Sequence, residues 1–151
     1  MKLGTFHGLI NGAYDEAGEA LKASFLRAGA KFLRATGKAL AAKGFTEVEV
    51  HSNRGGIAVS GEVYGYFFRP GEQVGCMVEV GTTCLSFPFA RMTDHVCVRY
   101  VWRCRREQGV HTPEGGNQWM SVRNDTFDSD ELARLLAREV ETGERRMSVP
   151  A

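Results

Sequence analysis

Residues 95–105 read HVCVRYVWRCR, and apolar and polar side chains alternate along most of this stretch. A period of two is typical of a β-strand with one buried face, because successive side chains point to opposite sides of the backbone. The predicted buried side carries Val96, Val98, Tyr100 and Trp102. The predicted outward side carries Arg99, Val101, Arg103 and Arg105. The stretch therefore predicts a sheet with one apolar face that another layer must cover.

Four more stretches in the middle of the chain follow the same period. Together the predicted strands are 45–51, 57–68, 74–80, 84–90 and 95–105, and 119–122 is a candidate sixth strand at the edge. Short polar or glycine-rich turns separate the first five, and turns of this length join antiparallel neighbours. Gly61 and Gly65 inside the second strand predict a bulge or a strong bend. The longest predicted loop covers 106–118.

Helical spacing of apolar residues marks both ends of the chain. Residues 11–43 predict one long amphipathic helix, or two that meet near Gly29, with Gly44 as a left-handed stop. Asp128 predicts the N-cap of a shorter helix that ends at Gly143. We expect the tail from Glu144 to Ala151 to fray.

The order helix, strands, helix predicts an α+β fold. In this fold a long N-terminal helix and a short C-terminal helix pack on one face of a curved antiparallel five- or six-stranded meander. The 151 residues, 43% of them hydrophobic, suffice for one domain, which we place at 1–143 with a tail at 144–151.

The composition excludes several classes of partner. A net charge of +1 gives no strong overall field for nucleic acid or an anionic membrane. The first residues lack the apolar run of an export signal, and no stretch approaches about 18 apolar residues. We therefore expect a cytoplasmic protein that does not interact with membranes.

Cysteine spacing argues against a metal centre. Cys76, Cys84, Cys97 and Cys104 include no Cys-x-x-Cys pair, and each falls in an apolar stretch. We expect packed, reduced thiols, no metal site and no cofactor. The alternative is a thiol enzyme with Cys97 as nucleophile and His95 as base, since the two residues share one side of the strand. A histidine at a strand start and a packed cysteine need no such role.

The predicted outward face of the sheet is the feature that most favours a function. Its members are Glu62, Tyr64, Tyr66, Phe68, Met77, Glu79, Arg99, Val101, Arg103 and Arg105. Tyrosine, methionine and arginine are enriched at protein interfaces. This composition predicts a partner-binding surface centred on Tyr64, Tyr66, Arg99, Arg103 and Arg105, with the 106–118 loop at its rim. The alternative is a face partly covered by that loop, with Glu62 and Glu79 in cross-strand ion pairs to arginine.

A second charged surface lies on the predicted long helix. Arg27, Lys31, Arg34 and Lys38 are spaced by four, three and four residues on one side. Such a stripe can follow a phosphate backbone, although a solvated helix face is the commoner use.

These features predict a non-enzymatic protein-binding module. Its most concrete form is a small bacterial or phage inhibitor of the anti-defence or immunity type that acts on a protein partner. One alternative is a single-stranded nucleic-acid-binding protein in which the outward tyrosines stack on bases and the arginines bind phosphates. The thiol enzyme is a second alternative. The outward aromatic face is also a candidate homodimer contact.

Overall fold

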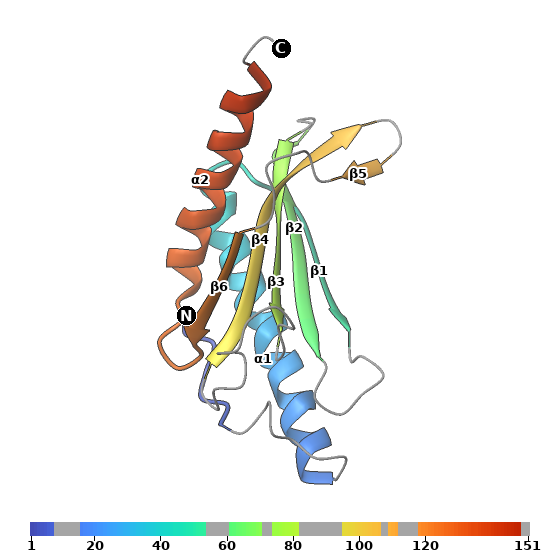
Figure 1. The fold of residues 1–151 in the computed structure, drawn as a ribbon, viewed down its shortest axis with the longest axis vertical. Coiled ribbons are helices and arrows are strands. Elements are labelled where there is room, and N and C mark those ends of the chain that lie inside the picture. The colour runs from blue at the N-terminus through green and yellow to red at the C-terminus, as the bar shows by residue number, and fades with distance from the viewer. Residues whose placement is uncertain are drawn as a thin grey trace.

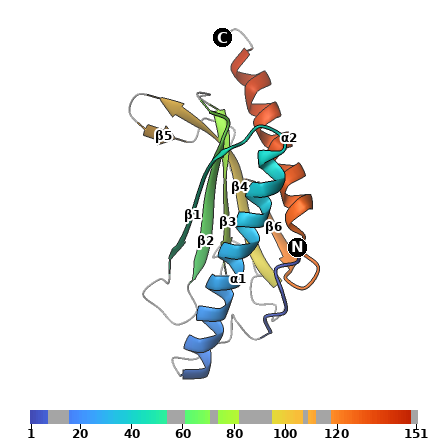
Figure 2. The same cartoon turned by 180° about the vertical axis from the view of Figure 1, so that it is seen from behind.

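The chain forms one layer of helices over one layer of antiparallel sheet (Figures 1 and 2). The computed structural model describes residues 1–7, 16–53, 61–70, 74–81, 95–106, 109–111 and 118–148. Both helices lie on the same side of the sheet, and they also contact each other. The predicted α+β fold is therefore confirmed.

Helix α1, Glu16–Ala41, has Glu16 and Glu19 in its first turn and Lys38 in its last, as the helix dipole favours. The chain leaves the helix at Gly44, whose φ of +93° lies in the left-handed region. The amide of Phe45 then donates to the carbonyl of Leu40 at 3.1 Å. The predicted stop at Gly44 is confirmed, and the predicted start at Asn11 lies outside the described residues.

Six strands make up the described sheet. They are β1 Glu47–Asn53, β2 Glu62–Phe68, β3 Val74–Gly81, β4 His95–Arg106, β5 Gly109–His111 and β6 Gln118–Arg123. The first four pair in sequence order as an antiparallel meander. The long strand β4 then pairs with β6 along its first half and with β5 at its end.

Two predictions about the strands need correction. Strand β3 pairs directly with β4, from Val74 opposite Cys104 to Gly81 opposite Cys97. The predicted strand 84–90, which lies outside the described residues, is therefore not inserted between them. The predicted loop 106–118 contains strand β5, because β4 extends to Arg106 and gives Gly109–His111 a partner.

The second helix, α2, runs Ser129–Ser148, so the predicted stop at Gly143 is wrong. A Cβ atom on Gly143 would lie 2.4 Å from the Trp102 ring, so the glycine permits close packing of the helix on the sheet. Beyond it, Glu144 accepts a hydrogen bond from Arg69 at 2.6 Å, which fixes the next turn to the sheet. The start is as predicted, since the Asp128 carbonyl accepts the first helical bond, from Leu132 at 3.0 Å.

The core lies between the two layers and confirms the predicted inward side of the sheet. Its fully buried helix residues include Phe25, Phe32, Leu33, Leu40, Leu132 and Leu136. The sheet contributes Val63, Phe67, Cys76, Val78, Val80, Val96, Val98 and Trp102, with Val50 and Tyr100 partly buried against them. Val48 was also predicted inward but is 39% exposed, because it lies on the outermost strand. The predicted core residues Val59, Leu85 and Phe87 lie outside the described residues.

Gly65 was predicted to mark a bulge or a strong bend, and the strand register shows no bulge there. Gly65 pairs with Val50 on one side and Val78 on the other, in ladders that continue without interruption. A Cβ atom at this position would lie 2.9 Å from the Phe67 ring. The glycine therefore makes room for a core aromatic ring within a regular strand.

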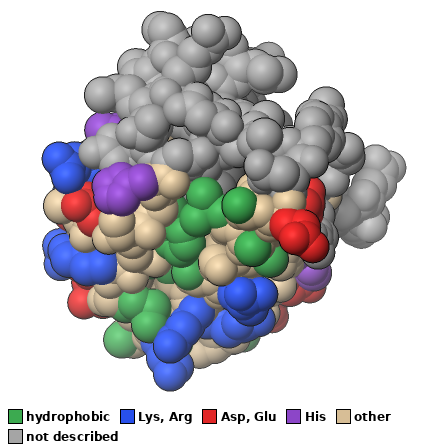
Figure 3. All heavy atoms as spheres, turned by 90° about the horizontal axis from the view of Figure 1, so that it is seen from below, with side chains coloured by type: hydrophobic (Ala, Val, Ile, Leu, Met, Phe, Trp, Pro, Cys, Tyr) green, Lys and Arg blue, Asp and Glu red, His purple; other side chains and the backbone are tan. Residues whose placement is uncertain are grey.

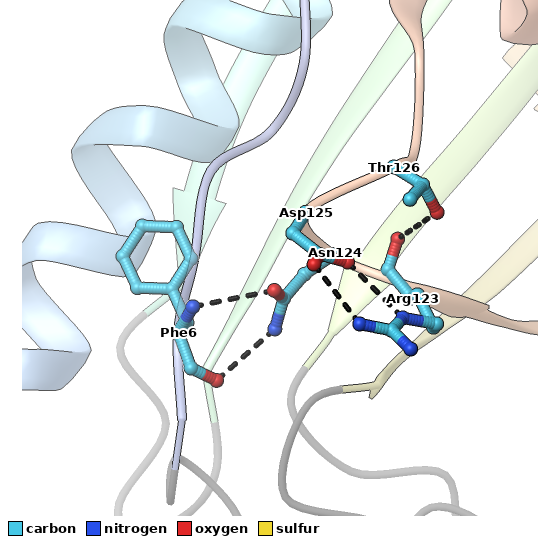
Figure 4. A network of polar contacts seen from close by, with 5 residues as sticks. All are labelled: Phe6, Arg123, Asn124, Asp125 and Thr126. Atoms are coloured by element: carbon cyan, nitrogen blue, oxygen red, sulfur yellow. Dashed lines mark hydrogen bonds and ion pairs between the residues drawn. The ribbon is translucent and has the colours of Figure 1, made fainter.

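The N-terminal residues close one end of the core, which the sequence patterns did not predict. The buried side chain of Asn124 accepts a hydrogen bond from the Phe6 amide at 3.2 Å and donates to the Phe6 carbonyl at 3.0 Å (Figure 4). The Phe6 ring then meets the Phe25 ring edge-on at 5.6 Å. In the same turn, Arg123 pairs with Asp125 at 3.0 Å. The turn between β6 and α2 thus holds the first residues against α1.

Candidate functional site

A row of polar and aromatic side chains crosses four strands on the sheet face that the helices leave uncovered. His51 lies opposite Tyr64, Tyr64 opposite Glu79, and Glu79 opposite Arg99. Directly opposite residues of an antiparallel sheet share a face. Tyr64 and Arg99 therefore lie together on the outward side, as the sequence predicted.

A second row lies one step along the strands and brings Tyr66 beside the first. Tyr66 lies opposite Glu49 on β1 and opposite Met77 on β3. The Tyr64 and Tyr66 rings meet edge-on with centroids 6.1 Å apart, and the His51 ring lies 5.3 Å from Tyr64. These three rings form a cluster, which we call the aromatic group, on β1 and β2.

An ion pair borders the aromatic group on β3 and β4. The Arg99 guanidinium donates to the Glu79 carboxylate at 2.7 Å, and the two side chains are 22% and 27% exposed. This confirms the predicted cross-strand pairing for Glu79. Glu62 instead accepts a hydrogen bond from the Asn53 side chain at 3.2 Å. The Arg99 guanidinium is therefore paired with a carboxylate of the neighbouring strand.

Exposure decreases across this face from β1 to β4. The side chains of Glu49 and His51 on β1 are 70% and 50% exposed. Tyr64 and Tyr66 are partly exposed, whereas Phe68, Met77 and Val101 are almost completely buried. These three apolar residues were predicted to point outward, and their burial agrees with the alternative of a face that is partly covered. Burial removes these apolar side chains from water, which is favourable, so this part of the face belongs to the packed interior.

Phe68 shows how the packed part is built. It lies opposite Gly75 on β3, where a Cβ atom would come within 2.3 Å of the Phe68 ring and 2.5 Å of the Phe67 carbonyl. The ring therefore occupies the space over the glycine. The accessible candidate surface is reduced to the aromatic group, Glu49 and the Glu79–Arg99 pair.

The remaining predicted contact residues divide into two sets. Arg103 and Arg105 lie on β4, opposite Gly75 and Val110, but their side chains fall outside the described part of the structure. Arg27, Lys31, Arg34 and Lys38 are all exposed on α1. Since α1 covers the inward face, this stripe and the aromatic group lie on opposite sides of the molecule.

The described face seen from below shows no single dominant charge. Viewed from below, Lys and Arg side chains alternate with Asp, Glu and His (Figure 3). This mixed distribution agrees with the net charge of +1. An extended basic track of the kind that holds nucleic acid is not visible on this view of the described atoms.

The thiols occupy different faces of the sheet. Cys76 is fully buried under the helices, and its burial, with a smaller effect of the Glu139 charge, raises the pKa of its thiol. Cys97 points to the outward face of the sheet, lies opposite Gly81 and Ser121, and is 5% exposed. Both are free cysteines, as predicted. Cys84 and the side chain of Cys104 lie outside the described residues.

His51 and Glu49 are the residues of the surface that the sequence prediction missed. The pattern that placed Val48 and Val50 inward also gave Glu49 and His51 outward parity. Their proximity to Tyr64 and Tyr66 follows from the register of β1 with β2, which the alternation of side chains does not give.

Searches for other kinds of site and for relatives gave negative results. Among the residues described, no group of three or more His, Cys, Asp or Glu side chains is arranged to hold a metal ion. Neither described helix has the length and apolar character needed to cross a membrane. Comparison of the chain with protein-family models, curated proteins and solved structures found no match.

Proposed function

We propose that this protein is a non-enzymatic protein-binding module whose contact surface is the outward sheet face around Tyr64, Tyr66 and Arg99. The observation that supports this proposal is the aromatic group, with one exposed and two partly exposed rings, beside the Glu79–Arg99 ion pair. Tyrosine and arginine are the side chains that most often dominate binding energy at protein interfaces.

The arrangement favours binding because its side chains already contact one another. Tyr64 is held between the rings of His51 and Tyr66, and Arg99 is held by Glu79. Fixing a mobile side chain on binding costs roughly 0.5–1.5 kcal/mol. Side chains that are fixed before contact avoid part of this cost, so a small surface can still bind.

Single-stranded nucleic acid is a weaker candidate ligand for the same surface. Stacking on Tyr64 and Tyr66 would need a nearby cation to bind phosphate, but Arg99 is neutralised by Glu79. The basic stripe of α1 lies on the opposite side and cannot join the aromatic group in one short site.

A thiol enzyme is also a weaker candidate. A cysteine nucleophile has to reach its substrate, whereas Cys97 is 5% exposed in a paired strand. Its burial favours a packing role.

Affinity capture with paired surface variants tests the proposal. The variant Tyr64→Ala/Tyr66→Ala removes two rings of the aromatic group, and Arg34→Ala/Lys38→Ala is a matched control on the helix layer. We expect proteins captured by the wild type to be lost with the tyrosine variant and retained with the control. The captured partner is then confirmed by titration of the purified pair.

The folded state of both variants is checked by circular dichroism. Full capture of the same partner by Tyr64→Ala/Tyr66→Ala would remove the assignment of this surface. Retention of a single-stranded oligonucleotide by the wild type, with a steep decrease at higher salt, would favour the nucleic-acid alternative instead.

A further inference from the structure

Strand β1 is the outermost strand on one side of the described sheet. It pairs with β2 along its whole length, from Glu47 opposite Phe68 to Asn53 opposite Glu62. No strand in the described ranges pairs with its other side, and β1 is the outer margin of the sheet in both views (Figures 1 and 2). Every residue from His51 to Asn53 is exposed, as are Val48 and Glu49. The edge is therefore accessible to another strand.

Sheet edges are commonly protected against pairing by proline, by charged residues, especially lysine, by a bulge or by a very short strand. Of these protections, β1 has only the charged residues Glu47 and Glu49. The sequence EVEVHSN contains neither proline nor lysine, the register has no bulge, and the strand is 7 residues long. Val48 is 39% exposed on the helix side of this edge. The strand has the length and regularity to accept a partner by edge addition.

The residues of β1 are complementary to themselves in one antiparallel register. When two copies of β1 meet about a two-fold axis at Val50, each Glu49 lies opposite His51 of the second copy. The same register places Val50 opposite Val50, Val48 opposite Ser52 and Glu47 opposite Asn53. A Glu–His contact of this kind already exists within one chain, at 3.6 Å between Glu49 and His51. No like charges face each other directly in this arrangement.

Neighbouring registers bring identical polar residues face to face. An axis at Glu49 places Glu47 opposite His51 but also sets the two Glu49 carboxylates opposite each other, and an axis at His51 places the two histidines opposite each other. Like charges on facing residues destabilise an antiparallel pair. For two copies of β1 this pattern therefore favours the register about Val50, in which no two carboxylates face each other.

We propose that β1 is a dimerisation edge that pairs antiparallel with β1 of a second copy of this chain about an axis at Val50. The sheets of the two copies then form one continuous sheet, with both helix layers on the same side. The two aromatic groups lie on its outward face, on either side of the axis. This proposal concerns the strand edge and does not depend on the binding function proposed above.

Charge variants of the full chain test the proposal in solution. The association constant is measured by sedimentation velocity and light scattering over a wide concentration range. His51→Glu places a carboxylate opposite Glu49 of the second copy, and Glu49→Arg places a guanidinium opposite His51. Each variant changes two symmetric contacts, so we expect self-association to weaken at least about tenfold. Glu131→Arg, an equivalent charge change on the exposed side of α2, leaves it unchanged.

Mixing the two charge variants is the decisive experiment. In an equimolar mixture the guanidinium of one variant faces the carboxylate introduced in the other, and His51 of the first faces Glu49 of the second. The mixture should therefore form a heterodimer although each variant alone is largely monomeric. General destabilisation of the fold would not produce this recovery.

The register is tested separately by cross-linking, which does not require the charge variants to fold. Under mild oxidation Val50→Cys should form a disulfide-linked dimer, because position 50 faces itself, whereas Ser52→Cys should not. The wild type, with its native cysteines, is the control. A wild type that is monomeric at every concentration overturns the proposal. So does a dimer that is unaffected by His51→Glu and Glu49→Arg, or a cross-link through position 52 rather than 50.

Discussion

The two faces of the same sheet differ in how they are stabilised. On the inward face, valines and aromatic rings pack against two helices, and almost all of them are completely buried. On the outward face, exposure decreases from the charged strand β1 to the packed residues Met77 and Val101. One face therefore carries most of the folding energy, and the other can carry a surface for contact.

The comparison shows that parity, the alternation of side chains between the two faces along a strand, does not by itself define a surface. Tyr66 and Met77 lie opposite each other on the outward side, yet Tyr66 is partly exposed and Met77 is 1% exposed. Parity assigns a side chain to a face, whereas accessibility depends on what else packs on that face. The difference between the faces leads to four predictions, given from the largest expected effect to the smallest.

Truncation of a core ring should cost far more than truncation of an outward ring. Phe32 is fully buried and lies 4.8 Å from the Phe127 ring. Phe32→Ala should lower the free energy of unfolding by about 3–5 kcal/mol, because it leaves a cavity between the layers. Tyr66→Ala, which removes a partly exposed ring, should cost about 1 kcal/mol. Urea denaturation measures both, and equal costs would show that the outward face is as tightly packed as the core.

Gly143→Ala should destabilise the protein although alanine favours helices by about 1 kcal/mol over glycine. The added Cβ atom would lie 2.4 Å from the Trp102 ring, and overpacking of this kind costs about 1–3 kcal/mol. Thermal unfolding of Gly143→Ala is compared with that of Glu141→Ala, an exposed substitution in the same helix, which should be nearly neutral. A stabilised Gly143→Ala would contradict the close contact between α2 and the sheet.

The buried thiol of Cys76 should make the protein less stable in alkali. Burial raises the pKa of this thiol above its ordinary value of 9.0, so it keeps its proton when the unfolded chain loses it. The free energy of unfolding should therefore fall by up to about 1.4 kcal/mol per pH unit above pH 9. In Cys76→Ala this contribution disappears, and the cost of the substitution becomes smaller as pH rises. Val78→Ala is the control, since its cost should not depend on pH.

The Glu79–Arg99 pair should contribute only weakly to stability. A double-mutant cycle with Glu79→Gln and Arg99→Gln should give a coupling energy of about 0.2–1 kcal/mol, because the pair is partly exposed and screened by solvent. The coupling should decrease at high salt. A coupling of several kcal/mol would mean that the outward face is structural rather than available for contact.

Much of the fold was predictable because periodicity is a local property. The apolar spacing of α1, the stop at Gly44 and the inward valines of β2, β3 and β4 follow from residues close together in the sequence. Both glycine errors had one cause. Gly143 and Gly65 were interpreted by backbone conformation, whereas each makes room for a ring, that of Trp102 or Phe67. Close approach depends on a neighbour that local sequence does not reveal.

The candidate surface was predictable in part for the same reason. Parity correctly grouped Tyr64, Tyr66 and Arg99 on one face, but it included Met77 and Val101, which are buried. Parity also placed His51 on this face, but the contact of His51 with Tyr64 depends on the pairing of β1 with β2, which parity does not give.

The sequence by itself determined the two-layer α+β fold and the side of the sheet to which most residues point. Alternation and helical spacing encode these features directly, since each follows from backbone geometry within a single element. Only the tertiary structure decided which residues meet across strands, which outward side chains remain exposed and which strand ends the sheet. Those features arise from pairing and packing between segments far apart in the chain, so no local pattern contains them.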